Sequence, residues 1–260
     1  MNLRNIAAFA SLFLLLLVIG CGGAEQPAEE TAATEAAPAA EPIDPATAAT
    51  ISGKVSFEGT APRRRRIRMD AEVACAQMHS GPVYSENFVL NDNGTLRNVF
   101  VYVKSGLEGR SFPAPPDAVV LDQKGCMYTP HVVGAMVGQT VRVLNSDQTT
   151  HNVHPVPKIN QEWNRSQAPG ANPIEVTFAR DEIMIPVKCN VHPWMKSYIG
   201  VLKHPYFAVT GADGTFEIGN LPPGDYTLGV WHESLGSSEM QVSVAAQESK
   251  TVDFVLEKAS

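Results

Sequence analysis

The stretch Val141-Arg-Val-Leu-Asn-Ser-Asp-Gln-Thr-Thr-His151-Asn-Val-His154 decides the fold, because apolar residues alternate with other residues at its start. Alternation with period two is typical of a β-strand with one buried face. The pattern recurs between short turn signals, as in Ile51/Val55/Phe57, Val99/Val101/Val103, Val176/Phe178, Phe216/Ile218 and Tyr226/Leu228/Val230. After the N-terminal segment, only residues 70–78 are suited to a short helix. The chain is therefore predicted to be all-β and to form two β-sandwiches.

A second stretch, Cys189-Asn-Val-His192-Pro-Trp-Met195, places a thiol, an imidazole and a thioether in one short loop. Each side chain alone has an ordinary structural role, as a buried thiol, a polar strand end or a core filler. Together with His151 they make two imidazoles, a thiolate and a thioether, which is the ligand set of a type 1 copper centre. Such a set accommodates both Cu(I) and Cu(II), so it predicts one-electron transfer.

These two stretches resemble the amicyanin and plastocyanin branch of the cupredoxins, through Cys-x-x-His-Pro-x-Met, His-Asn-Val-His and the upstream pattern from Tyr128 to Asn145. The resemblance implies a Greek-key β-sandwich over residues 118–202. It also implies that the four copper ligands are His151, Cys189, His192 and Met195. Asn152 would then tie the two ligand loops together.

Two residues near these loops need separate treatment. His154 also fits the family pattern and is predicted not to be a ligand. Pro186 lies in the segment Ile183-Met-Ile-Pro-Val-Lys188, which replaces the more aromatic strand that normally leads to the cysteine. A proline there predicts an edge strand or a bulge.

The resemblance further implies where electrons enter. In that family the histidine that matches His192 reaches the surface through an apolar patch, and Pro193 and Trp194 would form part of that patch here. The alternative is that Trp194 packs into the core and is structural.

A second resemblance covers the C-terminal stretch from Ala208 to Leu228, which includes Asp213-Gly214 and Pro222-Pro-Gly224. It is similar to the prealbumin-like repeat of the carboxypeptidase regulatory-like family. That family opens with a G-x-V strand, which residues 51–55 match. One β-sandwich is therefore predicted from residues 51–117 plus 203–258, with the cupredoxin domain at 118–202 inserted. The alternative is two domains in series.

The N-terminus predicts export. Residues 6–19 are largely apolar but shorter than a membrane span needs, and Val18-Ile-Gly-Cys21 resembles a bacterial lipobox. A lipoprotein signal peptide is predicted at 1–20, followed by a lipidated Cys21 and a disordered linker at 21–50 that is rich in Ala, Glu, Pro and Thr. Gly22 in place of Asp favours the periplasmic face of the outer membrane over the inner membrane. An ordinary cleaved signal is the alternative.

Cys75 and Cys126 lie in a chain that is predicted to be exported, where a disulfide is the default. Two free thiols, or a metal or redox site with His79 and His131, are the alternatives.

The net charge of −7 argues against a nucleic-acid partner. The local exception is a run of arginines at 63–66 with Arg68. The run is either a solvated edge or a docking patch for an anionic partner or lipid headgroup.

The chain is predicted to be an electron carrier that exchanges single electrons with an unknown redox protein. It is predicted not to be an enzyme. The alternative is a structural or carbohydrate-binding envelope lipoprotein with a vestigial copper loop. A copper enzyme needs His-x-His pairs, and the sequence has none. His204 and His232 are predicted to be surface histidines.

Overall fold

The computed structural model describes residues 44–258. The predicted signal peptide, the lipidation site Cys21 and residues 22–43 of the linker lie outside the described residues. The last linker residues are structured, because strand β1 (Ala49–Glu58) begins there with a buried Ala49. No helix among residues 44–258 is long and apolar enough to cross a membrane.

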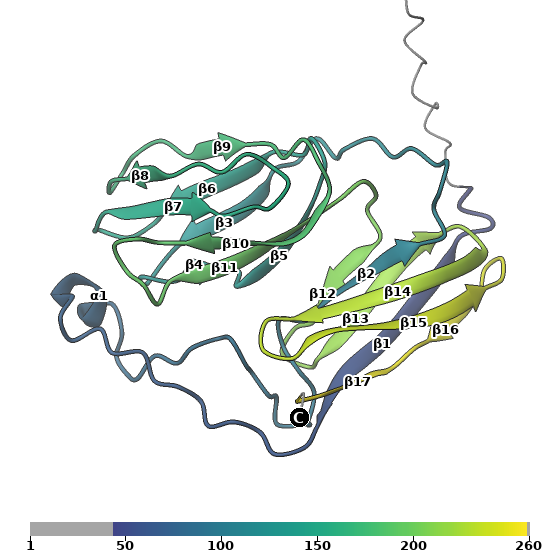
Figure 1. The fold of residues 1–260 in the computed structure, drawn as a ribbon, viewed down its shortest axis with the longest axis horizontal. Helices are drawn as coiled ribbons and strands as arrows, with labels where there is room; N and C mark the ends of the chain where they lie inside the picture. The colour runs from purple at the N-terminus through teal and green to yellow at the C-terminus, as the bar shows by residue number, and fades with distance from the viewer. Residues whose placement is uncertain (1–43, 259–260) are drawn as a thin grey trace, which may run out of the picture. The chain divides into compact units, whose positions relative to one another are not determined.

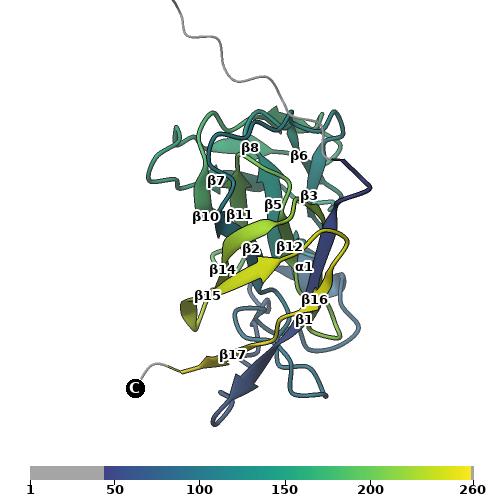
Figure 2. The same cartoon turned by 90° about the vertical axis from the view of Figure 1, so that its right-hand side faces the viewer.

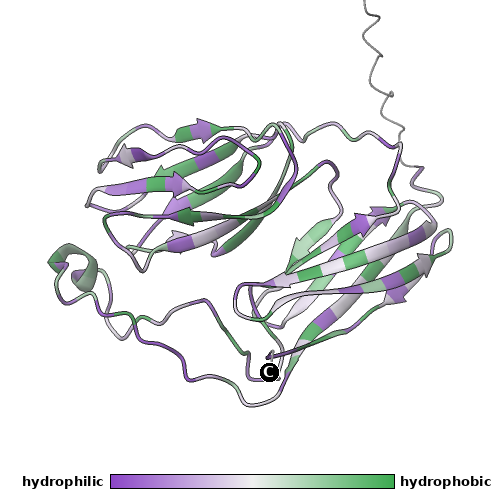
Figure 3. Ribbon diagram, in the orientation of Figure 1, coloured by the Kyte–Doolittle hydropathy of each residue, from purple (hydrophilic) through white to green (hydrophobic). Residues whose placement is uncertain are grey.

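The all-β prediction is confirmed. The described chain contains one α-helix, α1 (Val73–Gln77), which lies inside the range suited to a helix. Figure 3 shows hydrophobic and hydrophilic bands alternating along strands of both sandwiches. Strand β6 (Val141–Asn145) shows the reason, since Val141 and Val143 are buried while Arg142 between them is exposed.

The first sandwich combines strands from both ends of the described chain. One sheet has the order β13-β1-β16, and β17 also pairs with β1. The other has the order β12-β2-β14-β15. Figure 1 shows the dark blue β1 beside the yellow strands of the C-terminus. Their bounds are β2 (Phe100–Ser105), β12 (Phe207–Val209), β13 (Thr215–Leu221), β14 (Gly224–His232), β15 (Gly236–Val244), β16 (Ser249–Thr251) and β17 (Phe254–Glu257).

The pairing of β1 with β13, β16 and β17 supports the inserted arrangement, because the sheet needs strands from both sides of the segment 118–202. One hydrophobic core contains Ile51, Leu96, Leu221 and Leu228, all of them completely buried. The domain boundaries themselves stay predictions.

The second sandwich is formed by the strands between β2 and β12. One sheet has the order β4-β3-β6-β9 and the other has the order β5-β11-β10-β7-β8, which together make a mixed, Greek-key-like topology. Figures 1 and 2 show these two sheets as the two layers of the sandwich. The remaining bounds are β3 (Val119–Gln123), β4 (Tyr128–Thr129), β5 (Val132–Met136), β7 (His151–Pro155), β8 (Arg165–Gln167), β9 (Ile174–Val176), β10 (Glu182–Lys188) and β11 (Lys196–Leu202).

Strand β10 has a bulge just before Pro186, which itself pairs in register with Tyr198 of β11. The edge-strand alternative is wrong, because β10 lies between β11 and β7. Its register with β11 shifts between Glu182 and Ile185, and Met184 there has a φ of 61°. Strand β7 pairs only with Val187 and Lys188, so the missing N–H of Pro186 removes no bond of that ladder.

Residues 66–84, here called the cap, leave the first sandwich and pack on the second. Ile67, Met69 and Cys75 are buried in the same core cluster as Cys189 and Met195. The cap closes on itself through a bridge between Arg66 and Tyr84, with the Ile67 N–H donating to the Val83 carbonyl at 2.9 Å. The sequence places these residues with the first sandwich, whereas the apolar side chains of the cap belong to the second core.

Candidate metal centre

The four candidate ligands lie at adjoining strand ends. His151 begins β7, Cys189 follows β10, and Met195 directly precedes β11, with His192 in the loop between them. All four side chains are buried, each with at most 3% of its surface exposed. The loop from Cys189 to Met195 brings three of the four together because β10 and β11 are antiparallel neighbours.

Three donor atoms converge on one point. The Nδ1 atoms of His151 and His192 are 2.9 Å apart, and Cys189 Sγ is 3.8 Å from His192 Nδ1. One ligand atom from each of these residues lies within 4.8 Å of the others. The buried thioether of Met195 belongs to the core cluster that contains Cys189. Two imidazole nitrogens, a thiol and a thioether are the donor set that copper of either oxidation state accepts, so the residues fit the ion.

Backbone hydrogen bonds hold the ligand loop in shape. The Cys189 N–H donates to the Met195 carbonyl at 3.3 Å, and the Met195 N–H donates to the His192 carbonyl at 2.9 Å. The His192 N–H also points at Cys189 Sγ, at 3.4 Å. The loop is therefore organised by its own backbone.

The electrostatics of the metal-free site favour the metal-binding forms of Cys189 and His192 and the protonated form of His151. Burial raises the pKa of the Cys189 thiol, but hydrogen bonds from His151 and from backbone N–H groups outweigh it, so that pKa is lowered. Burial opposes the charged form of His151, yet its contacts with Asp147 and Cys189 raise the pKa of His151 to about 9. Burial, together with the charge of His151, lowers the pKa of His192. The lowered pKa values of Cys189 and His192 favour a thiolate and a neutral imidazole, which both bind metal ions, whereas a metal ion has to displace the proton that Asp147 and Cys189 favour on His151.

Asp147 is a site residue that the sequence did not single out. Its buried carboxylate lies 2.8 Å from His151 Nε2 and accepts the backbone N–H groups of Gly125 at 2.6 Å and Cys126 at 2.7 Å. Burial raises the pKa of Asp147, but these hydrogen bonds outweigh it and lower that pKa. A carboxylate on Nε2 orients the ring and leaves Nδ1 for a metal ion. The one available signal was its position four residues before His151.

Asn152 joins the two ligand loops, as its predicted role requires. Its side-chain oxygen accepts the N–H of Asn190, which follows Cys189. The buried Tyr128 hydroxyl reaches the same two segments, since it lies 2.6 Å from the Asn152 carbonyl and 3.1 Å from the Lys188 carbonyl. Both contacts keep β7 and β10 in register next to the ligands.

The cap covers His192. Cys75 Sγ lies 3.5 Å from His192 Nε2, and a Glu72 carboxylate oxygen lies 3.9 Å from the same nitrogen. Only 1% of His192 is exposed. The prediction that its ring edge reaches the surface is therefore wrong, because residues 66–84 occupy the space through which it would be reached.

The disulfide holds the cap in place. Cys75 and Cys126 are bonded, with their Cα atoms 5.5 Å apart. Trp194 is half-buried, packs against the core and donates its indole N–H to the Cys126 carbonyl at 3.0 Å, while Pro193 is exposed. The packing of Trp194 matches the structural alternative, and a docking role for Pro193 and Trp194 stays a prediction.

The remaining histidines lie apart from the ligands. His79 contacts the Gly125 carbonyl at 2.8 Å, His131 contacts Glu233 at 2.8 Å, and His154 contacts Glu162 at 2.7 Å. The prediction of surface exposure is wrong for His232, which is 1% exposed and packs against aromatic Phe88, 5.8 Å between ring centroids. Burial lowers the pKa of His232 to about 4, and that of the half-buried His204 likewise.

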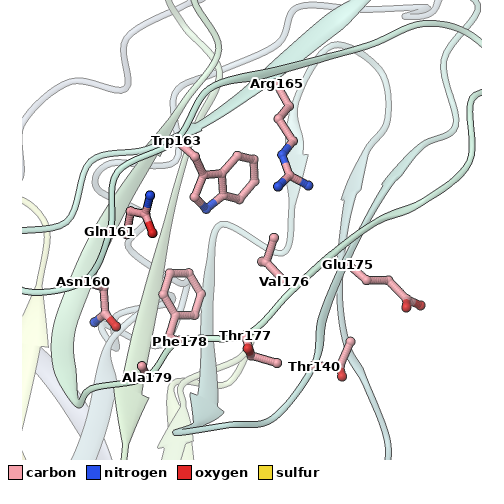
Figure 4. Close-up of a pocket in the computed structure, with 10 residues that line it drawn as sticks. All are labelled: Thr140, Asn160, Gln161, Trp163, Arg165, Glu175, Val176, Thr177, Phe178 and Ala179. Carbon is pink, nitrogen blue, oxygen red and sulfur yellow. The ribbon is translucent and has the colours of Figure 1, made fainter. Parts of the chain in front are cut away.

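A surface hollow of the second sandwich lies elsewhere. Figure 4 shows its lining residues, and no candidate ligand is among them: Thr140, Asn160, Gln161, Trp163, Arg165, Glu175, Val176, Thr177, Phe178 and Ala179. One face of the Trp163 ring is covered by the Arg165 guanidinium, 5.2 Å from the ring centroid. The metal donors are thus enclosed by protein, away from this open hollow.

One family model matches part of the chain and agrees with the second resemblance. Residues 201–257 match the family model of the carboxypeptidase regulatory-like domain, so that resemblance is confirmed. No curated protein matches the chain. The matched residues run from strand β11 to β17 of the all-β body.

The similar solved structures include a copper-containing nitrite reductase, a purple cupredoxin and an amicyanin mutant. A copper-containing nitrite reductase from Thermus scotoductus SA-01 is 19% identical over 39% of this chain, with a TM-score of 0.31, and the match spans 25% of that enzyme. A purple cupredoxin from Nitrosopumilus maritimus is 19% identical over 32% of this chain and 98% of its own, with a TM-score of 0.28. A Cu(I) amicyanin mutant is 24% identical over 39% of this chain and 97% of its own, with a TM-score of 0.29. The copper in these names belongs to those proteins.

Proposed function

We propose that this chain holds one copper ion with His151, Cys189, His192 and Met195 and carries single electrons between extracytoplasmic redox proteins. The convergence of His151 Nδ1, His192 Nδ1 and Cys189 Sγ in a buried loop carries the proposal. A bound copper ion would supply a Cu(I)/Cu(II) couple.

The protein supplies a rigid and dry environment. Backbone hydrogen bonds hold the loop from Cys189 to Met195, and Asp147 and Asn152 fix the orientation of His151 and the spacing of the two loops. Ligands that are held in this way rearrange little when the charge at the site changes by one, which lowers the barrier to electron exchange. Burial of all four side chains keeps substrates away from the donors, which favours a carrier over an enzyme.

The location of the carrier is part of the proposal and rests on the N-terminal sequence. A lipid on Cys21 would tether the body through the linker, at the periplasmic face of the outer membrane. Palmitate labelling of the expressed full chain tests this, with a Cys21→Ser variant as the control. Equal labelling of both proteins would contradict the anchor.

The copper assignment is tested by colour. Full-length protein loaded with Cu(II) should absorb visible light intensely, because the Cys189 thiolate donates charge to the ion. Cys189→Ser should lose that absorption completely. The matched control is His154→Gln, which changes a histidine outside the site and should leave the spectrum unchanged. A colourless copper complex in the parent protein overturns the type 1 assignment, and a chain that takes up no copper favours a structural envelope lipoprotein instead.

A further inference from the structure

The cap stands between His192 and solvent, so a partner that exchanges electrons with the metal centre on this side meets the cap first. Cys75 packs its sulfur 3.5 Å from the histidine ring, and the helix that carries it exposes Val73, Ala74 and Ala76 on the other side. A single layer of chain thus separates the ligand ring from the outside.

The entry to the cap carries the arginine run on its outer face. Arg63 to Arg66 are all exposed, and from there burial alternates, with Ile67 and Met69 inside and Arg68 outside. The inward residues anchor in the core of the second sandwich, so the guanidinium groups of Arg66 and Arg68 are held on its surface. The Arg64 guanidinium lies 4.6 Å from the ring centroid of Tyr84, across the bridge that closes the cap.

These five guanidinium groups are not neutralised. Within residues 44–258 none of them forms an ion pair, whereas other basic side chains do: Lys54 with Asp253, Lys104 with Glu239, Arg142 with Glu175 and Lys203 with Asp181. The acidic residues of the cap, Asp70 and Glu72, offset only part of this charge. An unpaired cationic run on a chain of net charge −7 is a local field of opposite sign to the rest of the molecule.

We propose that the surface formed by Arg63 to Arg66 and Arg68, here called the arginine face, is the docking surface for an acidic one-electron redox protein. The proposal rests on the proposed function, since it names the partner of that site. One electron passes between the metal centre and the partner's redox group across the cap, and no bond forms or breaks. Guanidinium groups suit carboxylates because they pair with them through two parallel hydrogen bonds, and a charged face speeds encounter without binding too tightly for release.

A protein fits this face better than a lipid surface does. Binding to a bilayer draws on apolar side chains beside the basic ones. Here the apolar residues of the run, Ile67 and Met69, point into the core, and Val73 is the one large apolar side chain that the cap exposes, which is little to insert into a bilayer. The arginines also lie on the segment that covers a metal ligand, where a redox partner has to approach and a lipid does not.

The test compares two variants of equal net charge. The first is Arg65→Gln/Arg66→Gln/Arg68→Gln, here called the cap variant or Gln variant. The control is Arg142→Gln/Arg165→Gln/Arg180→Gln, which removes three exposed arginines from the rest of the second sandwich. The probe is an acidic c-type cytochrome, and its affinity for the copper-free full chain is measured by calorimetry at low and high salt. The cap variant should bind about tenfold more weakly at low salt, from three rim contacts of ordinary size. Equal affinities for the two variants overturn the proposal.

A second variant separates charge from folding. Arg65→Lys/Arg66→Lys/Arg68→Lys keeps the charge, so it should retain the salt-dependent binding that the Gln variant loses. The Gln and Lys variants of Arg65, Arg66 and Arg68 should have the melting temperature of the parent, because these three side chains are exposed. A Lys variant whose binding no longer weakens with added salt would show that charge does not govern the binding, and would overturn the proposal.

Two further measurements distinguish the sources of failure. With copper loaded, the cap variant should exchange electrons more slowly with the cytochrome and at the parent rate with a small inorganic oxidant. The copper-loaded cap variant should have the same colour as the parent. Because binding is measured on copper-free protein, a parent protein whose copper complex is colourless would count against the copper assignment alone. If the cap variant loses binding to phosphatidylglycerol vesicles but keeps its affinity for the cytochrome, the face recognises lipid headgroups and the proposal fails.

Discussion

The two nitrogen atoms of the His192 ring face two different kinds of sulfur. Nδ1 lies 3.8 Å from the free thiol of Cys189 in the ligand loop, and Nε2 lies 3.5 Å from the disulfide sulfur of Cys75 in the cap. The lowered pKa of the Cys189 thiol favours the thiolate that binds metal ions, whereas a sulfur in a disulfide cannot ionise. Both sulfurs are buried, so the difference between them is their oxidation state. The free thiol of Cys189 can bind a metal ion, and the disulfide sulfur of Cys75 only packs against the His192 ring.

The disulfide of the cap also affects which thiols are available near the ligand loop. Cys75, Cys126 and His192 would themselves form a cluster of possible ligands, with atoms within 4.8 Å of one another. Their disulfide removes two competing thiols from the neighbourhood of Cys189. The disulfide also fixes the cap to the second sandwich. The cap covers the edge of the His192 ring, which the sequence predicted to be at the surface.

Removing the disulfide should have the largest effect on stability. Cys75→Ala/Cys126→Ala opens a loop with a sequence separation of 51 residues, and chain entropy predicts a loss of about 4 kcal/mol in the free energy of unfolding. Urea unfolding of the copper-free protein measures it. The freed cap should also expose His192, so diethyl pyrocarbonate should modify that ring faster than in the parent.

The matched control keeps the covalent link. His79→Gln removes the contact of the His79 ring with the Gly125 carbonyl but leaves the disulfide in place, and should cost only about 1 kcal/mol. If the double alanine variant loses no more stability than this control, the disulfide does not hold the cap.

Asp147→Asn should have an intermediate effect. The amide cannot accept both backbone N–H groups and the His151 ring as the carboxylate does, so we expect a loss of about 1–3 kcal/mol in the copper-free protein. Because the folded pKa of Asp147 lies below its ordinary 3.8, its contribution is present above that value and is lost as the pH falls through the lowered pKa.

The pH dependence gives the sharper test of Asp147. Below about pH 4 the unfolded chain takes up the proton first, so the parent should lose stability faster with falling pH than Asp147→Asn does. Between about pH 5 and 6 the difference between the two proteins should be constant, and it should shrink as the pH rises from about 6.5 to 9, because Asp147 helps to raise the pKa of His151 to about 9. Parallel curves through the acid range would show that the carboxylate charge has no part in holding His151.

Met195→Leu should have the smallest effect on stability, below about 1.5 kcal/mol, because the two side chains are similar in size. A thioether that is a weak axial ligand tunes the potential more than it holds the ion. The variant should therefore keep copper and colour while its reduction potential rises, which voltammetry measures. Loss of copper would show that Met195 holds the ion, and the assignment as a weak axial ligand would be wrong.

The ligand loop could be read from the sequence because its geometry is local. Cys189, His192 and Met195 lie within one turn between two strands, and backbone hydrogen bonds inside that loop suffice to bring them together. His151 was found through its position at the end of an alternating strand. Pro186 predicted an irregular strand, since a proline removes one N–H from a sheet, but the bulge itself lies just before it, between Glu182 and Ile185.

The sequence by itself determined the strands, the turns and the donor set, since period-two burial and ligand spacing are properties of neighbouring residues. Only the tertiary structure decided what surrounds the site. The contact of Cys75 with His192 spans a separation of 117 residues, that of Asp147 with Cys126 spans 21, and His232 is buried by packing against Phe88 from a distant part of the chain. Such contacts depend on how whole segments pack, and no local pattern encodes the packing of the cap over a metal ligand.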